Sequence, residues 1–323
     1  MHRIISICFF LFVANDIKAQ IKDTLNSSAQ EQTYTLSNGD KFSYIKPRFF
    51  DAITKVPSGV LGTVCDFGAT ENLIALGGAV ALTAGILPAD QHLLNQSRQI
   101  GEKVGLEEVA RYTNFGPLNN IPPNITSAIY LIGNGTTPIL MSMGFATFGL
   151  INNDYRALNT ASGLVESLAV SGVFSQTIKR ISGRQSPGPA MGDGNDGGDW
   201  NPFPSFIAYA KHTPHYDAMP SGHVMTATAA LNVILVNYPD KKWIKPVGYT
   251  LIGVLGFGMV QANVHWYSDY PLALVMGYII GKNIANSKII KNKNPLESPK
   301  KYSFNINASR KLDFNLIGAS ITF

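Results

Sequence analysis

The segment with the clearest chemical potential is Pro-Ser-Gly-His at 220–223. An apolar run, Val224–Val236, follows it at once, so we expect Ser221 to be the N-cap of a helix. Gly222 and His223 are then the first residues of that helix. The N-terminus of a helix offers unpaired N–H groups and a positive dipole end, which together attract anions. His223 adds a titratable group that can protonate a departing oxygen. The alternative is an ordinary Ser-capped helix with a bystander histidine.

A second chemically suggestive pair is His265 and Asp269. A histidine and a carboxylate four residues apart can meet on one turn. The carboxylate would fix the tautomer of the imidazole and raise its nucleophilicity, as in catalytic triads. Pro271 indicates that a helix begins at Ser268 or Asp269, which makes a simple helix cap the other interpretation of Asp269. The two roles are compatible because a carboxylate has two oxygens.

The third feature is a cluster of cations, Lys179, Arg180 and Arg184, after the apolar run Leu158–Phe174. Cations at the C-terminal end of a helix stabilise its dipole, which is the purely structural explanation. The functional explanation is a cationic clamp for a phosphate group.

In their order along the chain, the three features resemble the type 2 phosphatidic acid phosphatase superfamily, which includes bacterial acid phosphatases and vanadium haloperoxidases. That family has the pattern Lys-x6-Arg-Pro, then Pro-Ser-Gly-His, then Ser-Arg-x5-His-x3-Asp, and the resemblance covers roughly residues 125–284. The residues that match the pattern are Lys179, Pro187, Pro220, Ser221, Gly222, His223, His265 and Asp269.

The chain departs from the family pattern at two arginines. Ser186 stands at the first arginine and Met259 at the second, with Gly258 where the pattern has serine. Two bidentate donors to phosphoryl oxygens are therefore missing, and losing one such donor costs roughly two to three orders of magnitude in rate. Arg184 and Arg180 are the candidates for a replacement cation.

The resemblance implies a phosphatase that hydrolyses a phosphomonoester or a lipid (di)phosphate without a metal or cofactor. His265 would attack phosphorus to give a phosphohistidine, Asp269 would orient it, and His223 would protonate the leaving group. The expected phosphate-binding residues are Lys179, Arg184, Ser221 and Gly222. One alternative is a non-catalytic lipid- or anion-binding protein on the same scaffold. A second is a haloperoxidase with vanadate as cofactor, which the missing arginines disfavour.

The elements that would position these residues are apolar runs separated by short polar breaks. The composition is 45% hydrophobic and only 15% charged. Most runs have about 13 to 17 residues, fewer than the ~20 that cross a bilayer. They predict an all-α bundle of about six helices, in lipid or in water. The runs are Leu73–Leu87, Ile125–Ile132, Pro138–Ile151, Leu158–Phe174, Val224–Val236, Val247–Val260 and Leu272–Ile284.

The chain ends define the expected domain layout. Residues 1–19 have the pattern of a signal peptide, or alternatively of an uncleaved anchor. We therefore expect export to the cell envelope, at the inner membrane or in the periplasm. Residues 20–65 are predicted as an extended lead-in, 66–290 as the helical domain, and 291–323 as a basic, partly strand-like tail.

The remaining sequence features concern partners. The net charge of +5 is too small to favour nucleic acid, so the expected partners are a phosphorylated small molecule or lipid and a membrane. Four aromatic residues precede the 220–223 segment, and they either line an apolar entrance or belong to the core. These residues are Trp200, Phe203, Phe206 and Tyr209. The sequence does not predict an oligomeric state.

Overall fold

The computed structural model describes residues 22–23, 31–108, 122–292, 303–311 and 314–322. The predicted signal peptide therefore lies outside the described residues. The helices are α2 (Asp51–Thr54), α3 (Val56–Phe67), α4 (Thr70–Ile86), α5 (Asp90–Lys103), α6 (Ile125–Gly133), α7 (Thr136–Asn152), α8 (Tyr155–Ser182), α9 (Pro187–Asp193), α10 (Phe206–Lys211), α11 (Gly222–Asn237), α12 (Ile244–Gln261) and α13 (Tyr270–Asn286). Short 3₁₀ turns lie at η2 (Leu87–Ala89), η3 (Thr213–His215) and η4 (Tyr267–Asp269).

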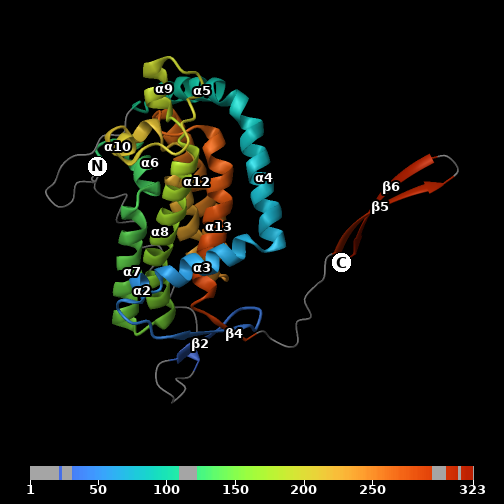
Figure 1. Cartoon of the computed structure of the whole chain (residues 1–323). Coiled ribbons are helices and arrows are strands. Elements are labelled where there is room, and N and C mark those ends of the chain that lie inside the picture. Colours follow the sequence, from blue (N-terminus) through green and yellow to red (C-terminus); the bar gives the residue numbers. More distant parts are fainter. Residues whose placement is uncertain (1–21, 24–30, 109–121, 293–302, 312–313, 323) are drawn as a thin grey trace.

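The predicted all-α bundle is confirmed, and each apolar run falls on a helix of this set (Figure 1). The helices begin earlier than expected. The range 20–65 was predicted as an extended lead-in, but α2 already starts at Asp51. The bundle also contains helices that the sequence did not predict. The main one is α5, which was not predicted because its composition is polar and the prediction relied on apolar runs.

The centre of the bundle is formed by α8, α11 and α13, which run alongside one another (Figure 1). Two glycines one turn apart, Gly277 and Gly281, allow α13 to lie directly against the backbone of α11. A Cβ at Gly277 would lie 2.5 Å from the carbonyl oxygen of Met225, and one at Gly281 would lie 2.2 Å from that of Ala229. No side chain fits in such a space. This contact therefore fixes the helix after His223 against the helix after Asp269.

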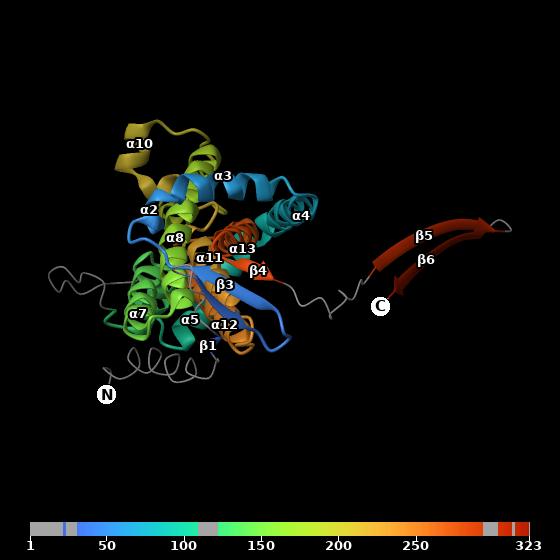
Figure 2. The same ribbon diagram turned by 90° about the horizontal axis from the view of Figure 1, so that it is seen from below.

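A small sheet covers the end of the bundle that lies away from α5 and α9, where β2 and β3 contact α8 (Figures 1 and 2). Its antiparallel strands have the order β1 (Lys22–Asp23), β2 (Glu31–Thr35), β3 (Lys41–Ile45) and β4 (Ile290–Asn292). The lead-in therefore pairs with the residues that follow α13. A separate hairpin of β5 (Ser303–Lys311) and β6 (Phe314–Thr322) confirms the strand-like tail.

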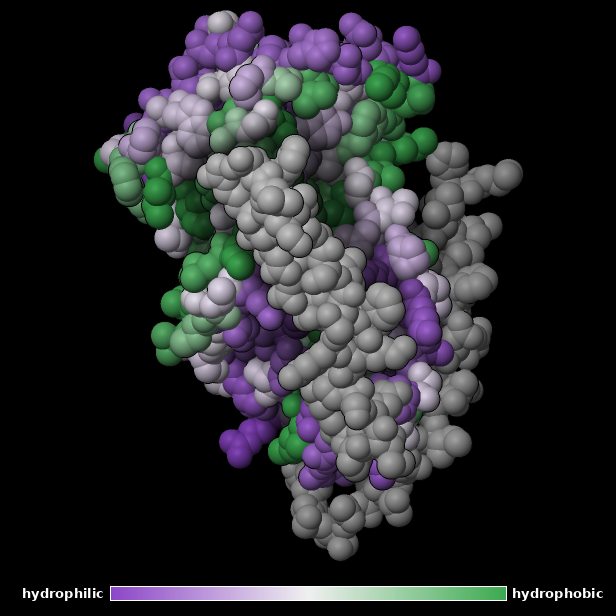
Figure 3. Space-filling view, turned by 90° about the vertical axis from the view of Figure 1, so that its right-hand side faces the viewer, coloured by the Kyte–Doolittle hydropathy of each residue, from purple (hydrophilic) through white to green (hydrophobic). Residues whose placement is uncertain are grey.

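Helix α4 differs from the central helices because most of its apolar side chains are exposed, among them Leu73, Ile74, Val80 and Leu82. Figure 3 views the molecule from this side and shows hydrophobic side chains gathered below a hydrophilic end. The continuous helical stretch Thr70–Lys103 is long and apolar enough to cross a membrane, and it is the one such stretch in the described part of the chain.

Candidate active site

The first motif forms the N-terminus of α11, as predicted. The Ser221 hydroxyl accepts a hydrogen bond from the N–H of Val224, and the helix begins at Gly222. Lys179 reaches this point from the end of α8, so that a Cβ on Gly222 would lie 3.8 Å from its Nζ. The backbone N–H of Ser221 also donates to the carbonyl of Asp269 over 3.1 Å. The structure thus brings the helix terminus, the lysine and the second motif together.

The second motif forms a tight turn in which Asp269 holds several groups at once. Its Oδ2 lies 3.3 Å from Nδ1 of His265 and accepts the backbone N–H of Trp266 at 2.8 Å. Asp269 occupies the N-cap position of α13, but its side chain makes no cap hydrogen bond to that helix. The carboxylate therefore serves the turn and His265 rather than the helix that follows.

Arg184 holds the other face of this carboxylate. Its fully buried guanidinium donates from Nη1 to Asp269 Oδ1 at 2.6 Å and from Nη2 to Asp90 Oδ2 at 2.7 Å. The rings of Trp200 and Trp266 lie 5.0 and 5.5 Å from its central carbon. Of its nitrogens, only Nε lacks a partner among the described residues. The contacts of Arg184 are therefore with carboxylates, whereas the sequence suggested a direct phosphate ligand.

Asp90 is a member of this network that the sequence analysis did not identify. It is fully buried at the start of α5 and contacts Ser268 through both the backbone N–H and the hydroxyl. Two further hydrogen bonds join the same helical stretch to the turn, from the Thr83 hydroxyl to the carbonyl of Ser268 and between Ser97 and Tyr267. Helices α4 and α5 therefore support the turn that carries His265.

Lys179 is paired with a second unpredicted carboxylate, Asp217. Its Nζ lies 3.3 Å from Asp217 Oδ2, and the Ser186 hydroxyl lies 3.5 Å from Asp217 Oδ1. The serine at the position of the first motif arginine thus faces a negative charge. The Asp217 side chain is 25% exposed whereas that of Lys179 is 8% exposed, so Asp217 lies on the solvent side of the lysine.

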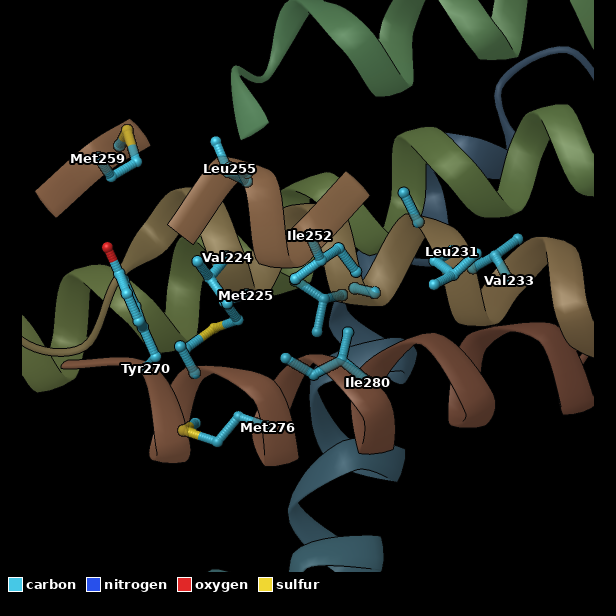
Figure 4. Close-up of a cluster of buried hydrophobic side chains, with 14 of the residues drawn as sticks. Val224, Met225, Leu231, Val233, Ile252, Leu255, Met259, Tyr270, Met276 and Ile280 are labelled. Atoms are coloured by element: carbon cyan, nitrogen blue, oxygen red, sulfur yellow. The ribbon is translucent and has the colours of Figure 1, made fainter. Parts of the chain in front are cut away.

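Met259, at the position of the second motif arginine, belongs to the hydrophobic core. It is fully buried in the cluster that contains Leu255, Val224 and Tyr270 (Figure 4). Its carbonyl oxygen accepts the backbone N–H of His265 at 3.3 Å. Met259 therefore helps to place His265 through its backbone, and it supplies an apolar side chain where the pattern has a cation.

His223 lies close to His265, with ring centroids 6.0 Å apart, and packs edge-on against Tyr130 at 4.6 Å. Burial lowers the pKa of His223 to about 3, and His265 and Lys179 act in the same direction. The imidazole is therefore neutral at pH 7. Burial alone would raise the pKa of Asp269, but Arg184 and His265 outweigh it and hold that pKa below its ordinary value.

The other candidate residues lie at the edge of this arrangement. Arg180 donates to Gln176 and stacks over Tyr209 at 4.2 Å, so it does not take the place of a motif arginine. Three of the four aromatic residues considered for an entrance are exposed, and Tyr209 is buried; the exposed ones are Trp200, Phe203 and Phe206. No cluster of three or more His, Cys, Asp or Glu residues in the described ranges is arranged to hold a metal ion.

The comparisons with known proteins agree with the family resemblance. Residues 160–289 match the family model described as the PAP2 superfamily. No curated protein matches the chain. One similar solved structure is a transmembrane PAP2 type phosphatidylglycerolphosphate phosphatase from Bacillus subtilis, with 12% identity and a TM-score of 0.38. The alignment covers 74% of this chain and 96% of that one.

Proposed function

We propose that this protein is a phosphatase that hydrolyses a phosphomonoester or lipid (di)phosphate through a phosphohistidine. The observation that carries the proposal is the placement of His265, held by Asp269, next to His223 at the N-terminus of α11. A nucleophile, its orienting carboxylate and a second imidazole beside an anion-binding helix terminus are the parts that phosphoryl transfer to histidine requires. The match of residues 160–289 to the PAP2 superfamily model supports the same activity.

In the proposed reaction, the phosphoryl oxygens bind the N–H groups at the start of α11 and Nζ of Lys179. Asp269 accepts a hydrogen bond from the N–H at Nδ1 of His265, which leaves Nε2 with the lone pair that attacks phosphorus. The negative charge of the bound phosphoryl group raises the pKa of His223 above its value in the free protein, so that His223 is protonated in the complex. The P–O bond to the leaving group breaks as the N–P bond forms, and the protonated His223 supplies the proton to the departing oxygen. Water then hydrolyses the phosphohistidine. Arg184 acts behind Asp269 by keeping that carboxylate ionised and in place.

Labelling with a radioactive phosphoester tests this chemistry. We expect an acid-labile, alkali-stable label on the protein that is lost in His265→Ala. In His223→Ala the label should form slowly where the leaving group needs a proton, and at a near-normal rate with p-nitrophenyl phosphate, whose leaving group needs none. A label that persists in His265→Ala would exclude this histidine as the nucleophile.

A second candidate function, non-catalytic binding of an anion or lipid, is favoured by the contacts that replace the motif arginines. Met259 is an apolar core residue, and Arg184 is saturated at both terminal nitrogens by carboxylates and their neighbours. Release of phosphate from p-nitrophenyl phosphate or phosphatidic acid, lost in His265→Ala, separates catalysis from binding. The vanadate haloperoxidase alternative requires a cationic cage for a trianion, and halide oxidation after adding vanadate tests it directly.

We also infer that the protein acts at a lipid surface in the cell envelope. The exposed apolar side chains of α4 support this inference, because exposed apolar patches commonly mark contacts with a membrane or another protein. The exposed rings of Trp200, Phe203 and Phe206 lie on the loop and helix that precede the site. Fractionation of cells should place the full chain with the membranes, and replacing Leu73, Ile74 and Leu82 with serine should release it or lower its yield there.

A further inference from the structure

The feature that the proposed reaction does not use is the carboxylate of Asp217. It pairs with the same lysine that would bind the phosphoryl group, and it faces Ser186 where the family pattern has an arginine. A carboxylate at this point repels a phosphate dianion. A site that only bound simple phosphomonoesters would be better without it.

The charge balance around the two histidines also disfavours a simple phosphomonoester as the ligand. The ion pairs of the site contain two cations, Lys179 and Arg184, and three carboxylates, Asp90, Asp217 and Asp269. Two of these carboxylates are already bound to Arg184. Lys179 alone then faces both Asp217 and an incoming phosphoryl group, and it cannot neutralise the two together.

The contact between Lys179 and Asp217 is also longer than a strong ion pair. Its single N–O distance is 3.3 Å, whereas charge-assisted hydrogen bonds are typically about 2.7–2.9 Å long. Asp217 is the more exposed partner. When Lys179 turns to a phosphoryl group, the carboxylate needs a replacement cation, and the ligand itself is the simplest source.

We propose that Asp217 selects phosphate esters that carry an ammonium group two carbons from the ester oxygen, that is, 2-aminoalkyl phosphates. A phosphoryl oxygen and the Asp217 carboxylate would share Lys179 as a neighbour, so they would lie within about 6 Å of each other. A two-carbon arm spans this distance. The resulting order of charges is lysine, phosphate, ammonium and carboxylate, in which every neighbour has the opposite sign. This specificity rests on the proposed phosphate site.

The test compares two esters of equal length, O-phosphoethanolamine and n-propyl phosphate, which differ by an ammonium in place of a methyl group. We expect the wild-type chain to favour O-phosphoethanolamine about tenfold in kcat/KM, as one charge-assisted contact allows. Asp217→Asn should bring the ratio close to one, mainly by improving n-propyl phosphate. Asp196→Asn, which removes an equal charge from an exposed loop, should leave the ratio unchanged.

Binding to the inactive variant His265→Ala, measured by calorimetry with the same two esters, separates this proposal from the phosphatase proposal. If the two Kd values differ about tenfold but the wild-type chain hydrolyses neither ester, the proposed specificity of Asp217 is supported and the phosphatase proposal is rejected. Equal hydrolysis of both esters, or a preference that survives Asp217→Asn, would overturn the role of Asp217 and keep the phosphatase. If neither ester binds, both proposals fail. A matched long-chain pair in detergent micelles shows whether the preferred ester is water-soluble or a lipid.

Discussion

Arg184 donates to Asp269 across 2.6 Å from a fully buried position, on the side of the carboxylate opposite His265. The chain therefore has a guanidinium close to the expected phosphate site, but it acts on the carboxylate that holds His265, the proposed nucleophile. Its second carboxylate partner, Asp90, ties the same guanidinium to α5. The consequence is a site whose turn is firmly held and whose cationic surface is small.

Replacing Arg184 with methionine should destabilise the protein strongly. Two buried carboxylates would lose their common partner, and breaking a buried pair in this way costs about 3–5 kcal/mol. The free energy of unfolding, measured with urea on the full chain, checks this value. Arg98→Met is the matched control, because Arg98 pairs with Glu108 near the surface and should contribute less than about 1 kcal/mol. Equal losses in the two variants would contradict a buried network around Arg184.

Asp90→Asn tests whether α5 positions the catalytic turn. The amide keeps the shape of the side chain but weakens its hold on Arg184 and Ser268, so the turn should lose rigidity without losing any ligand of the phosphate. We expect kcat to fall about tenfold with KM within about twofold, as for a group that acts only through geometry. Asp66→Asn, on the neighbouring helix α3 and bound to Asn283, is the control. A rise in KM with unchanged kcat would instead place Asp90 in substrate binding.

Restoring the motif arginines should have opposite results at the two positions. In Ser186→Arg the new guanidinium has Asp217 within reach, so we expect correct folding and about tenfold tighter inhibition by inorganic phosphate. In Met259→Arg the charge enters the apolar cluster of Figure 4, which should cost more than about 4 kcal/mol. Thermal unfolding and phosphate inhibition measure the two effects. A stable, more active Met259→Arg would show that this side of the site is open to phosphate.

The parts of the fold that the sequence predicted depend on local signals. Ser221 caps α11 because a hydroxyl before an apolar run is a local property, and the runs from Leu158 and Leu272 became α8 and α13 for the same reason. The pairing of β3 with β4 joins Ser43 to Ile290, and no local pattern in the lead-in indicates such a distant partner. Polar α5 was missed because its buried positions are Asp90, Leu94, Ser97 and Gly101, among which Leu94 alone is a large apolar residue.

The same difference between local patterns and contacts across the chain explains which site residues could be predicted. His223, His265 and Asp269 were found because their spacing within short motifs is characteristic. Asp90 and Asp217 were missed because their partners, Arg184 and Lys179, lie on other elements, 94 and 38 residues away along the chain. Asp217 had one usable signal, its place three residues before Pro220. The direction of the Arg184 side chain had none, since a buried guanidinium and a phosphate clamp look the same in sequence.

The depressed pKa of His223 predicts how the stability of the protein changes with pH. An unfolded histidine titrates near 6.5, whereas His223 in the folded protein titrates at about 3. Between these values the unfolded chain binds more protons, so the free energy of unfolding falls as the pH is lowered through this window. The slope from this group is at most about 1.4 kcal/mol per pH unit, because a single imidazole binds no more than one proton. His223→Gln should remove this component between pH 7 and pH 5, whereas His92→Gln, at an exposed position, should keep it. Urea unfolding at the two pH values measures the difference, and identical slopes in the wild type and His223→Gln would show that the imidazole is freely hydrated.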